Sequence, residues 1–466
     1  MKQSVSIPVM SPVERKNFSE ERDKLYICLV DFLTNFIKRE VQIEESDRFY
    51  EIVLHKFLYM YVQDIVTIKY VGHYYKPVSS SKRINIPSNI REYSNLRHND
   101  SNFYRQLFNV LVSDVFLYVN KRKKIGYKRY IKSFLFKIRC VLNVRAKKVL
   151  LFSEYYPKYW SQLFANRKVI KVSLRTLDLE GEASVDKELR MRLFHTLQQE
   201  FDCKYIVNSL PIALPTDLLE NFRKNYNSVK RQISFKNVDL MVSGWFPDHW
   251  NTILAAIGVS KGVELAIVQH GGGYGADEFH FMEMIERRIS DRFYGWSLKE
   301  YNARYLPVLP TRLHSFKVRY DKLIEQESFK EKKFKILIAD TLHYATPHIF
   351  DILGYSGQKK YLIDFISEYG DGQGTGIVVR LYFSRYAKNI QFLNELKSLF
   401  PCLCIHNETM PVEYDIANSE LLYVNYLYST FEWEANYVGR EVKVLPGVKE
   451  VFEGVKKEHI SYSLPD

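Results

Sequence analysis

The sequence predicts an α/β protein with two Rossmann-like domains that face a cleft, together with a helical N-terminal extension. Two series of short runs rich in Val, Ile and Leu, separated by helix-length segments, indicate two parallel sheets covered by helices. A glycine-rich loop directly follows one of these runs, at an edge where open α/β sheets bind ligands. At 466 residues the chain is too long for one compact core and predicts two or three domains.

We expect residues 1–146 to form a helical N-terminal region that belongs to the first domain. Residues 1–20 are polar and indicate a loose lead-in, whereas residues 77–99 contain a Ser run and Pro and indicate a loop. Apolar side chains recur at helical spacing over residues 20–70 and 102–120, which predicts helices there.

A strongly basic segment closes this region. Residues 121–148 hold twelve Lys or Arg and no acid, with apolar residues interleaved at helical spacing. This pattern predicts a basic amphipathic helix, which could lie on an anionic membrane surface or pack its apolar stripe on the domain. Nucleic-acid binding is the weaker interpretation, since no known reader module accompanies the charge.

We expect residues 147–320 to form the first Rossmann-like domain, which would lie on the side of the cleft that binds the acceptor. A helix is expected over residues 248–259. Short branched runs indicate strands at residues 149–152, 169–172, 205–207, 240–242 and 264–268.

A charged stretch with several prolines after Trp296 predicts an interdomain linker. We expect residues 334–450 to form a second domain, which binds the nucleotide sugar, and residues 451–466 to form a C-terminal tail. Two such halves with a linker describe the GT-B architecture, one of several two-domain α/β folds with this pattern. Helices are expected over residues 359–369 and 387–399. Strands are expected at residues 335–339, 376–381, 402–405, 421–424 and 442–445.

The glycine-rich loop supplies the candidate reaction centre. Residues 269–275 read Gln-His-Gly-Gly-Gly-Tyr-Gly, and four glycines let the backbone approach a ligand closely. An ordinary strand-to-helix turn needs only one or two glycines and no histidine. The catalytic candidates are Asp248, His270, Glu283 and Glu286, and the loop candidates are Gln269, Gly271, Gly272, Gly273, Tyr274 and His249. Asp248 could instead be a helix N-cap, and the two glutamates could be ion-pair partners of neighbouring arginines.

The nucleotide-site candidates follow strands of the second domain. Ser429 and Thr430 precede a predicted helix, whose free N–H groups favour phosphate, and Glu434 could accept hydrogen bonds from ribose hydroxyls. The alternative is a plain N-cap with an acid near the helix start. Arg380 and His343 lie near other strand ends and could contact phosphate or base.

Composition bounds the remaining chemistry. A formal charge of +13 favours anionic partners, while no apolar run is long enough to span a bilayer. Five scattered cysteines and no signal-peptide pattern at Met1 predict a cytoplasmic protein. The sequence contains no phosphate-binding P-loop motif, no Gly-x-Ser-x-Gly and no Asp-x-Asp motif, so we expect metal-independent chemistry without a cofactor.

The region around the glycine loop resembles a family of bacterial transferases of surface-carbohydrate biosynthesis. The resemblance lies in residues 269–275, in Glu283 and Glu286, and in residues 289–296, with weaker matches at 209–220 and 429–434. It covers residues 147–450, and the 269–275 block is its specific part. Asn-Tyr-Val at 436–438 departs from the small residues usual there, and Arg-Glu at 440–441 departs from the usual Gly-x-Pro ending.

This resemblance implies a GT-B transferase, similar more distantly to the capsule and lipopolysaccharide transferases that use CMP-activated acids such as Kdo. On that analogy His270 and the glycine loop lie at the reaction centre, while Ser429, Thr430 and Glu434 hold the nucleotide. The expected partners are a CMP-sugar, a lipid-linked glycan acceptor and the inner face of the membrane. The alternatives are a GT-B sugar epimerase and a non-catalytic membrane-associated or nucleic-acid-binding protein that uses residues 121–148.

Overall fold

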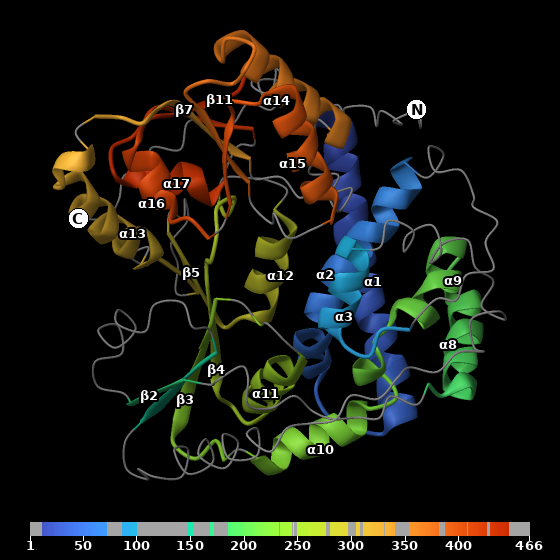
Figure 1. The fold of residues 1–466 in the computed structure, drawn as a ribbon. Coiled ribbons are helices and arrows are strands. Elements are labelled where there is room, and N and C mark those ends of the chain that lie inside the picture. The colour runs from blue at the N-terminus through green and yellow to red at the C-terminus, as the bar shows by residue number, and fades with distance from the viewer. Residues whose placement is uncertain are drawn as a thin grey trace, which may run out of the picture.

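The described chain contains two parallel sheets, and helices pack against each of them (Figure 1). The computed structural model describes residues 12–71, 86–99, 147–152, 168–171, 185–232, 234–244, 246, 249–275, 280–296, 304–307, 311–329, 331–340, 354–381, 387–407, 409–425 and 429–446. None of the helices in these ranges is both long and apolar enough to cross a bilayer.

The first sheet has six strands, all parallel, in the order β2-β1-β3-β4-β5-β6. Its strands are β1 (Lys148–Leu151), β2 (Lys168–Lys171), β3 (Val238–Ser243), β4 (Glu264–Val268), β5 (Arg292–Gly295) and β6 (Tyr305–Pro307). The chain order reverses between β1 and β3, which is the switch point where doubly wound sheets bind ligands. Ser243 pairs with Ile267, so the loops that follow β3 and β4 begin side by side.

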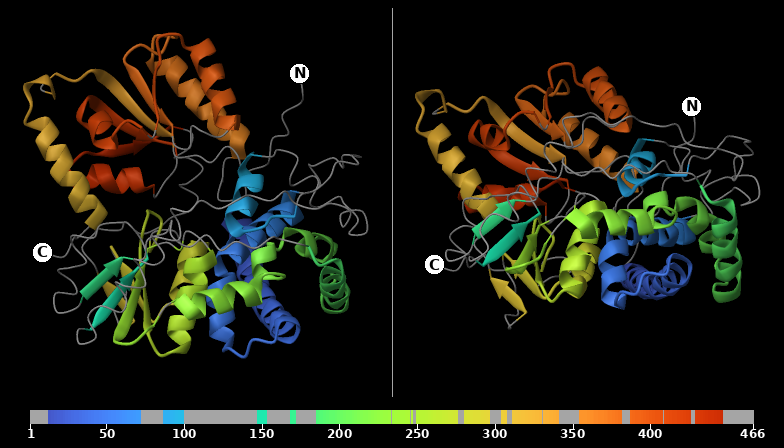
Figure 2. Two further views of the ribbon diagram at one scale, coloured as in Figure 1. Left: turned by 60° about the horizontal axis from the view of Figure 1, so that its bottom comes forward. Right: turned by 90° about the horizontal axis from the view of Figure 1, so that it is seen from below.

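Long N-terminal helices pack on this sheet's own helices rather than standing apart. Helix α2 contacts α11 and α12, and one continuous apolar core joins α1 and α2 to the helices of the first sheet. In every view the blue N-terminal helices lie among the green ones, as Figure 2 shows. The helices here are α1 (Pro12–Val41), α2 (Asp47–Val71), α3 (Ile90–Asn99), α8 (Lys187–Glu200), α9 (Lys204–Ala213), η2 (Thr216–Leu218), α10 (Phe222–Gln232), α11 (His249–Ser260) and α12 (Phe281–Ile289).

The second sheet has five parallel strands in the order β11-β10-β7-β8-β9. Its strands are β7 (Phe334–Asp340), β8 (Ile377–Leu381), β9 (Cys404–His406), β10 (Ser419–Val424) and β11 (Val442–Val444). Its helices are α13 (Thr311–Ile324), η3 (Glu327–Phe329), α14 (Gly354–Tyr369), α15 (Ala387–Leu399), α16 (Val412–Ala417) and α17 (Thr430–Tyr437). The order reverses between β7 and β10, where the Asn425 amide donates to Asp340 Oδ1 at 2.6 Å.

The predicted pair of parallel α/β sheets with a helical N-terminal extension is confirmed, whereas several local predictions are wrong. Residues 205–207 belong to helix α9, in which Ile206, Val207 and all residues from 209 to 213 are buried. Helix α1 already begins at Pro12, inside the predicted loose lead-in. The predicted linker contains helix α13, which packs on α16 and α17.

The basic segment is described only at its end. Lys148 starts strand β1 and is buried, so the predicted basic helix does not extend to residue 148. Residues 121–146, the helix expected over 102–120 and the tail at 451–466 lie outside the described residues.

Candidate functional site at the junction of the two sheets

The buried side chain of Gln269 fixes the start of the glycine loop. Its Nε2 donates to the carbonyl of Gly271 at 2.9 Å, and its Oε1 accepts from the backbone N–H of Trp296 at 2.8 Å. Gln269 therefore ties the loop after β4 to the end of β5. A buried amide with both ends bonded holds the backbone in place rather than facing a substrate.

Gly273 gives the loop a conformation and a close approach that other residues lack. Its φ is +88°, and an added Cβ would lie 2.8 Å from His280 Cδ2. Directly after it, the Tyr274 ring lies 4.4 Å from the His280 ring and stacks on Phe293 at 5.8 Å. The glycine thus lets Tyr274 enter the interior beside helix α12.

Tyr274 links His270 to Glu286. Its hydroxyl donates to Glu286 Oε2 at 2.7 Å and lies 3.0 Å from His270 Nδ1, and Glu286 Oε1 lies 3.7 Å from the same nitrogen. A quarter of the His270 side chain is exposed, whereas Tyr274 and Glu286 are buried. Of these three side chains, that of His270 is the most exposed to solvent.

The surroundings shift the pKa values of His270 and Glu286 in opposite directions. Desolvation lowers the pKa of His270 to about 3, together with nearby His280, Arg312 and Lys56, while a hydrogen bond to the Gly244 backbone opposes the shift. Burial raises the pKa of Glu286 well above its usual range, helped by the neighbouring charge of Glu283. The imidazole is therefore neutral at neutral pH.

Glu283 supports the loop from helix α12. Its Oε2 accepts from the backbone N–H of Gly275 at 2.7 Å, and its Oε1 pairs with Arg287 at 2.5 Å. The ion pair anticipated as an alternative for this residue is present. Glu286 has no such partner in Arg288, which pairs with Glu51 of α2 instead.

The loop touches the first turn of α17, in the second domain. The backbone N–H of Gly272 donates to Thr430 Oγ1 at 3.1 Å. Ser429 is the N-cap of α17, since its hydroxyl accepts from the N–H of Glu432 at 3.2 Å. The Trp433 ring meets Trp296 edge-on at 5.9 Å, within an apolar cluster that also includes strands of the first sheet. The two predicted halves of the site are thus in direct contact.

Glu434 forms an ion pair beneath this contact. Arg312, from α13, lies 2.9 Å from Glu434 Oε1, while the buried Oε2 accepts no hydrogen bond from any residue that the structure describes. Burial raises the pKa of Glu434, and the charges of Arg312 and Arg380 oppose that rise. One oxygen of this carboxyl therefore remains to accept a hydrogen bond.

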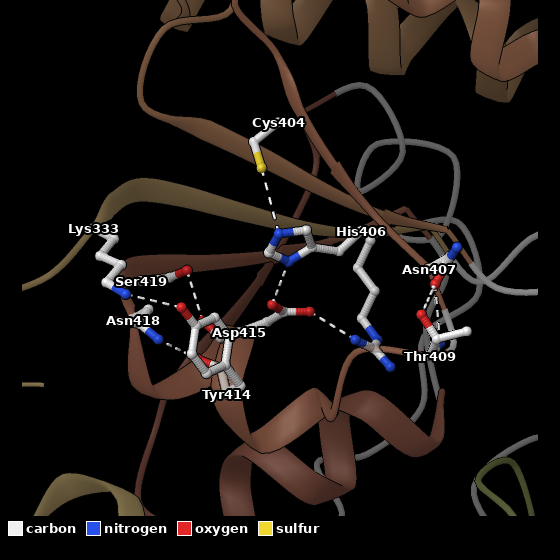
Figure 3. Close-up of polar contacts among 10 residues, drawn as sticks. Lys333, Cys404, His406, Asn407, Thr409, Tyr414, Asp415, Asn418 and Ser419 are labelled. Carbon is white, nitrogen blue, oxygen red and sulfur yellow. Dashed lines mark hydrogen bonds and ion pairs between the residues drawn. The ribbon is translucent and has the colours of Figure 1, made fainter. Parts of the chain in front are cut away.

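Arg380 is held by an acid of its own domain. Its Nη1 donates to Asp415 Oδ2 at 2.6 Å, and both residues are buried. The other oxygen of Asp415 lies 2.6 Å from His406 Nδ1, and Cys404 Sγ lies 3.4 Å from His406 Nε2, as Figure 3 shows. The predicted phosphate contact would have to share the guanidinium with this carboxylate.

The sequence profile described as "LIC12162 family transferase" matches residues 3–433. The chain belongs to this family. No curated protein sequence matches the transferase. Among solved structures it is similar to UDP-GlcNAc 2-epimerase from Neisseria meningitidis bound to UDP-GlcNAc, at 12% identity and a TM-score of 0.35. That similarity covers 66% of this chain and 85% of the epimerase.

The structure brings seven of the predicted residues of this transferase to one junction: Gln269, His270, Gly272, Tyr274, Glu286, Ser429 and Thr430. Glu283 and Glu434 lie just behind it, and Gly271 lies near Thr430. Asp248, His343 and the side chain of His249 lie outside the described residues. No three His, Cys, Asp or Glu side chains in the described ranges are grouped as a metal site requires.

Sequence reasoning missed Arg312 and Asp415. Arg312 lies in the stretch predicted as a linker, and its partner Glu434 is 122 residues further along the chain. Asp415 lies on the short helix α16, with nothing in its local pattern to separate it from a surface acid. In both cases only the burial of the partner distinguishes the residue.

Proposed function

We propose that this transferase moves a glycosyl group from a nucleotide-activated sugar to a glycan acceptor where its two sheets meet. The donor we propose is a CMP-activated acid of the Kdo or nonulosonic type, and the acceptor a lipid-linked surface glycan. The observation that carries the proposal is the hydrogen bond from Gly272 to Thr430. It joins the loop with the exposed histidine to the helix start with the predicted phosphate site.

The reaction forms one bond, breaks one bond and moves one proton. The acceptor hydroxyl oxygen attacks the anomeric carbon, the bond from that carbon to the phosphate oxygen breaks, and CMP leaves with the electron pair. His270, whose ring is partly exposed, takes the hydroxyl proton, and the bound anionic donor must raise its lowered pKa for this step. Tyr274 and Glu286 position the ring from behind. Asp248 is the other candidate for this base.

The start of α17 suits a leaving phosphate. Ser429 and Thr430 each accept a backbone hydrogen bond, which leaves each hydroxyl proton to donate to a phosphate oxygen. The positive end of the helix adds to this attraction. The unpartnered Oε2 of Glu434 would accept from a ribose hydroxyl. Arg380 and His343 remain proposed contacts of the nucleotide.

The remaining assignments rest on composition. The charge of +13 supports an anionic donor and attachment to the inner, anionic face of the cytoplasmic membrane through the basic side chains of residues 121–147. We propose that the reaction needs neither a metal nor an organic cofactor, and we expect no nucleic-acid partner.

Nucleotide-induced thermal shift tests the donor assignment. CMP at a hundred times its Kd should stabilise the protein by about 2.7 kcal/mol, whereas UMP should give a smaller shift. Thr430→Val should remove the CMP shift, and Ser367→Ala, which changes a surface hydroxyl on α14, should leave it intact. Absence of a shift with every nucleotide would overturn the donor assignment.

A transfer assay tests the chemistry. With CMP-N-acetylneuraminate and a glycan acceptor, His270→Ala should abolish the transfer product seen by mass spectrometry while CMP binding persists. Conversion of UDP-GlcNAc into its epimer, without transfer to any acceptor, would contradict glycosyl transfer and favour an epimerase.

A further inference from the structure

Helix α2 delivers a lysine to the ligand-binding edge of the first sheet. Lys56 Nζ donates to the carbonyl of Phe246, in the segment between β3 and α11, at 2.6 Å. The Phe246 ring packs edge-on against Phe152, which directly follows β1, and against His55, at 5.5 and 5.6 Å. The Lys56 ammonium therefore lies at the switch point between β1 and β3.

This ammonium lies close to His270. The His270 ring bonds to the backbone of Gly244, and Lys56 bonds to the backbone of Phe246, two residues further on. Two residues of chain span at most about 7 Å, so the two anchoring backbone groups lie within that reach of each other. One short backbone segment thus anchors both the partly exposed imidazole and the lysine.

The positive charge near the ring comes from two described residues. Lys56 lies on α2, and Arg312 lies on α13, where it also pairs with Glu434; each lowers the pKa of His270. Burial disfavours the charged form of Glu286, which lies 3.7 Å from the ring, and raises the pKa of its carboxyl. A group with negative charge would be stabilised beside His270.

We propose that Lys56 binds an oxyanion of the substrate beside His270, either the carboxylate of the transferred sugar or a phosphate of the acceptor. This makes α2 part of the substrate site and Lys56 a residue that selects acidic substrates. The inference rests on the proposed function and narrows its substrate class. A bound anion would also oppose the surrounding positive charges, raise the pKa of His270 and strengthen it as a base.

Three variants separate charge from structure. Lys56→Met keeps the side-chain stem and removes the charge, and Lys56→Arg keeps the charge. Lys69→Met removes a lysine from the exposed end of the same helix and is the matched control. In histidine NMR titrations Lys56→Met should raise the pKa of His270, whereas Lys69→Met should leave it unchanged.

Calorimetric Kd values for CMP, CMP-N-acetylneuraminate and inorganic phosphate then test the site. Lys56→Met should raise the Kd of CMP-N-acetylneuraminate at least tenfold and change the Kd of CMP by less than twofold. Lys56→Arg and Lys69→Met should retain both affinities. A tenfold loss for phosphate without a loss for the sugar acid would support the site and assign it to the acceptor phosphate.

Other outcomes overturn the inference. If Lys56→Met weakens CMP and CMP-N-acetylneuraminate equally, or only lowers Tm, Lys56 merely supports Phe246. If wild type binds none of these anions, there is no oxyanion site. If neither CMP nor CMP-N-acetylneuraminate binds, but phosphate binds and Lys56→Met abolishes phosphate binding, the proposed donor is wrong and the Lys56 site stands.

Discussion

Removal of the Tyr274 hydroxyl tests the arrangement behind His270. Tyr274→Phe keeps the ring in its stack on Phe293, so apolar packing is preserved. It removes the hydrogen bonds to Glu286 and to His270 Nδ1. Glu286 is buried and His270 is partly exposed, so the carboxyl bears most of the loss.

An orphaned buried polar group costs about 1–3 kcal/mol, and a partly exposed one less, because water replaces its partner. We therefore expect Tyr274→Phe to lower the free energy of unfolding by about 2–3 kcal/mol. Urea unfolding followed by circular dichroism measures this loss. Tyr369→Phe, at a ring that is 44% exposed, is the matched control and should change stability by about 0.5 kcal/mol or less.

A double-mutant cycle isolates the hydrogen bond itself. Glu286→Gln keeps the shape of the side chain and one acceptor oxygen for the Tyr274 hydroxyl, so it should cost only about 1 kcal/mol. In the Glu286→Gln background the Tyr274→Phe loss should change by at least 0.5 kcal/mol, a rough threshold for coupled neighbours. Strict additivity, or a Tyr274→Phe variant as stable as wild type, would refute the role given to this hydroxyl.

Three further substitutions probe the junction and the second domain. Arg312→Met should raise the already elevated pKa of Glu434 further, so its stability loss should grow between pH 5 and pH 8, by about 1.4 kcal/mol per unit of added pKa rise. Gly273→Ala should cost at least about 1–2 kcal/mol in urea unfolding, from its positive φ and from contact with His280. Asp415→Asn should cost about 3–5 kcal/mol, because it leaves a buried guanidinium without its counter-charge.

Each of these has an outcome that contradicts it. A pH-independent loss in Arg312→Met would show that Glu434 does not depend on that cation. A fully stable Gly273→Ala protein would mean that the loop tolerates a side chain. Asp321→Asn, in an exposed pair on α13, is the control for Asp415→Asn and should cost about 0.5 kcal/mol or less.

Local patterns predicted the strands wherever branched residues form a short run that is buried on both faces. Residues 149–151 and 336–338 are examples, and both became central parallel strands. The same rule failed at residues 205–207, since a three-residue run cannot distinguish strand from helix. There the apolar positions continue at helical spacing through Leu210, and tertiary packing selects the helix.

The glycine loop and the cap at Ser429 are set by local chemistry, so the sequence alone determined them. Four glycines after a buried strand predict a close-approach loop, and a Ser before a helix predicts an N-cap, whatever lies elsewhere in the fold. The two parallel sheets likewise follow from strand and helix periodicity, which repeats along the chain.

Only the tertiary structure decided which side chains meet. Lys56 reaches Phe246 across 190 residues, and Arg312 reaches Glu434 across 122. Glu283 and Glu286 look equivalent in sequence, yet one pairs with Arg287 and supports the loop, while the other bonds to Tyr274. Strand order and helix packing fix these pairings, because they determine which strand ends and helix faces become neighbours, and no local pattern encodes that proximity.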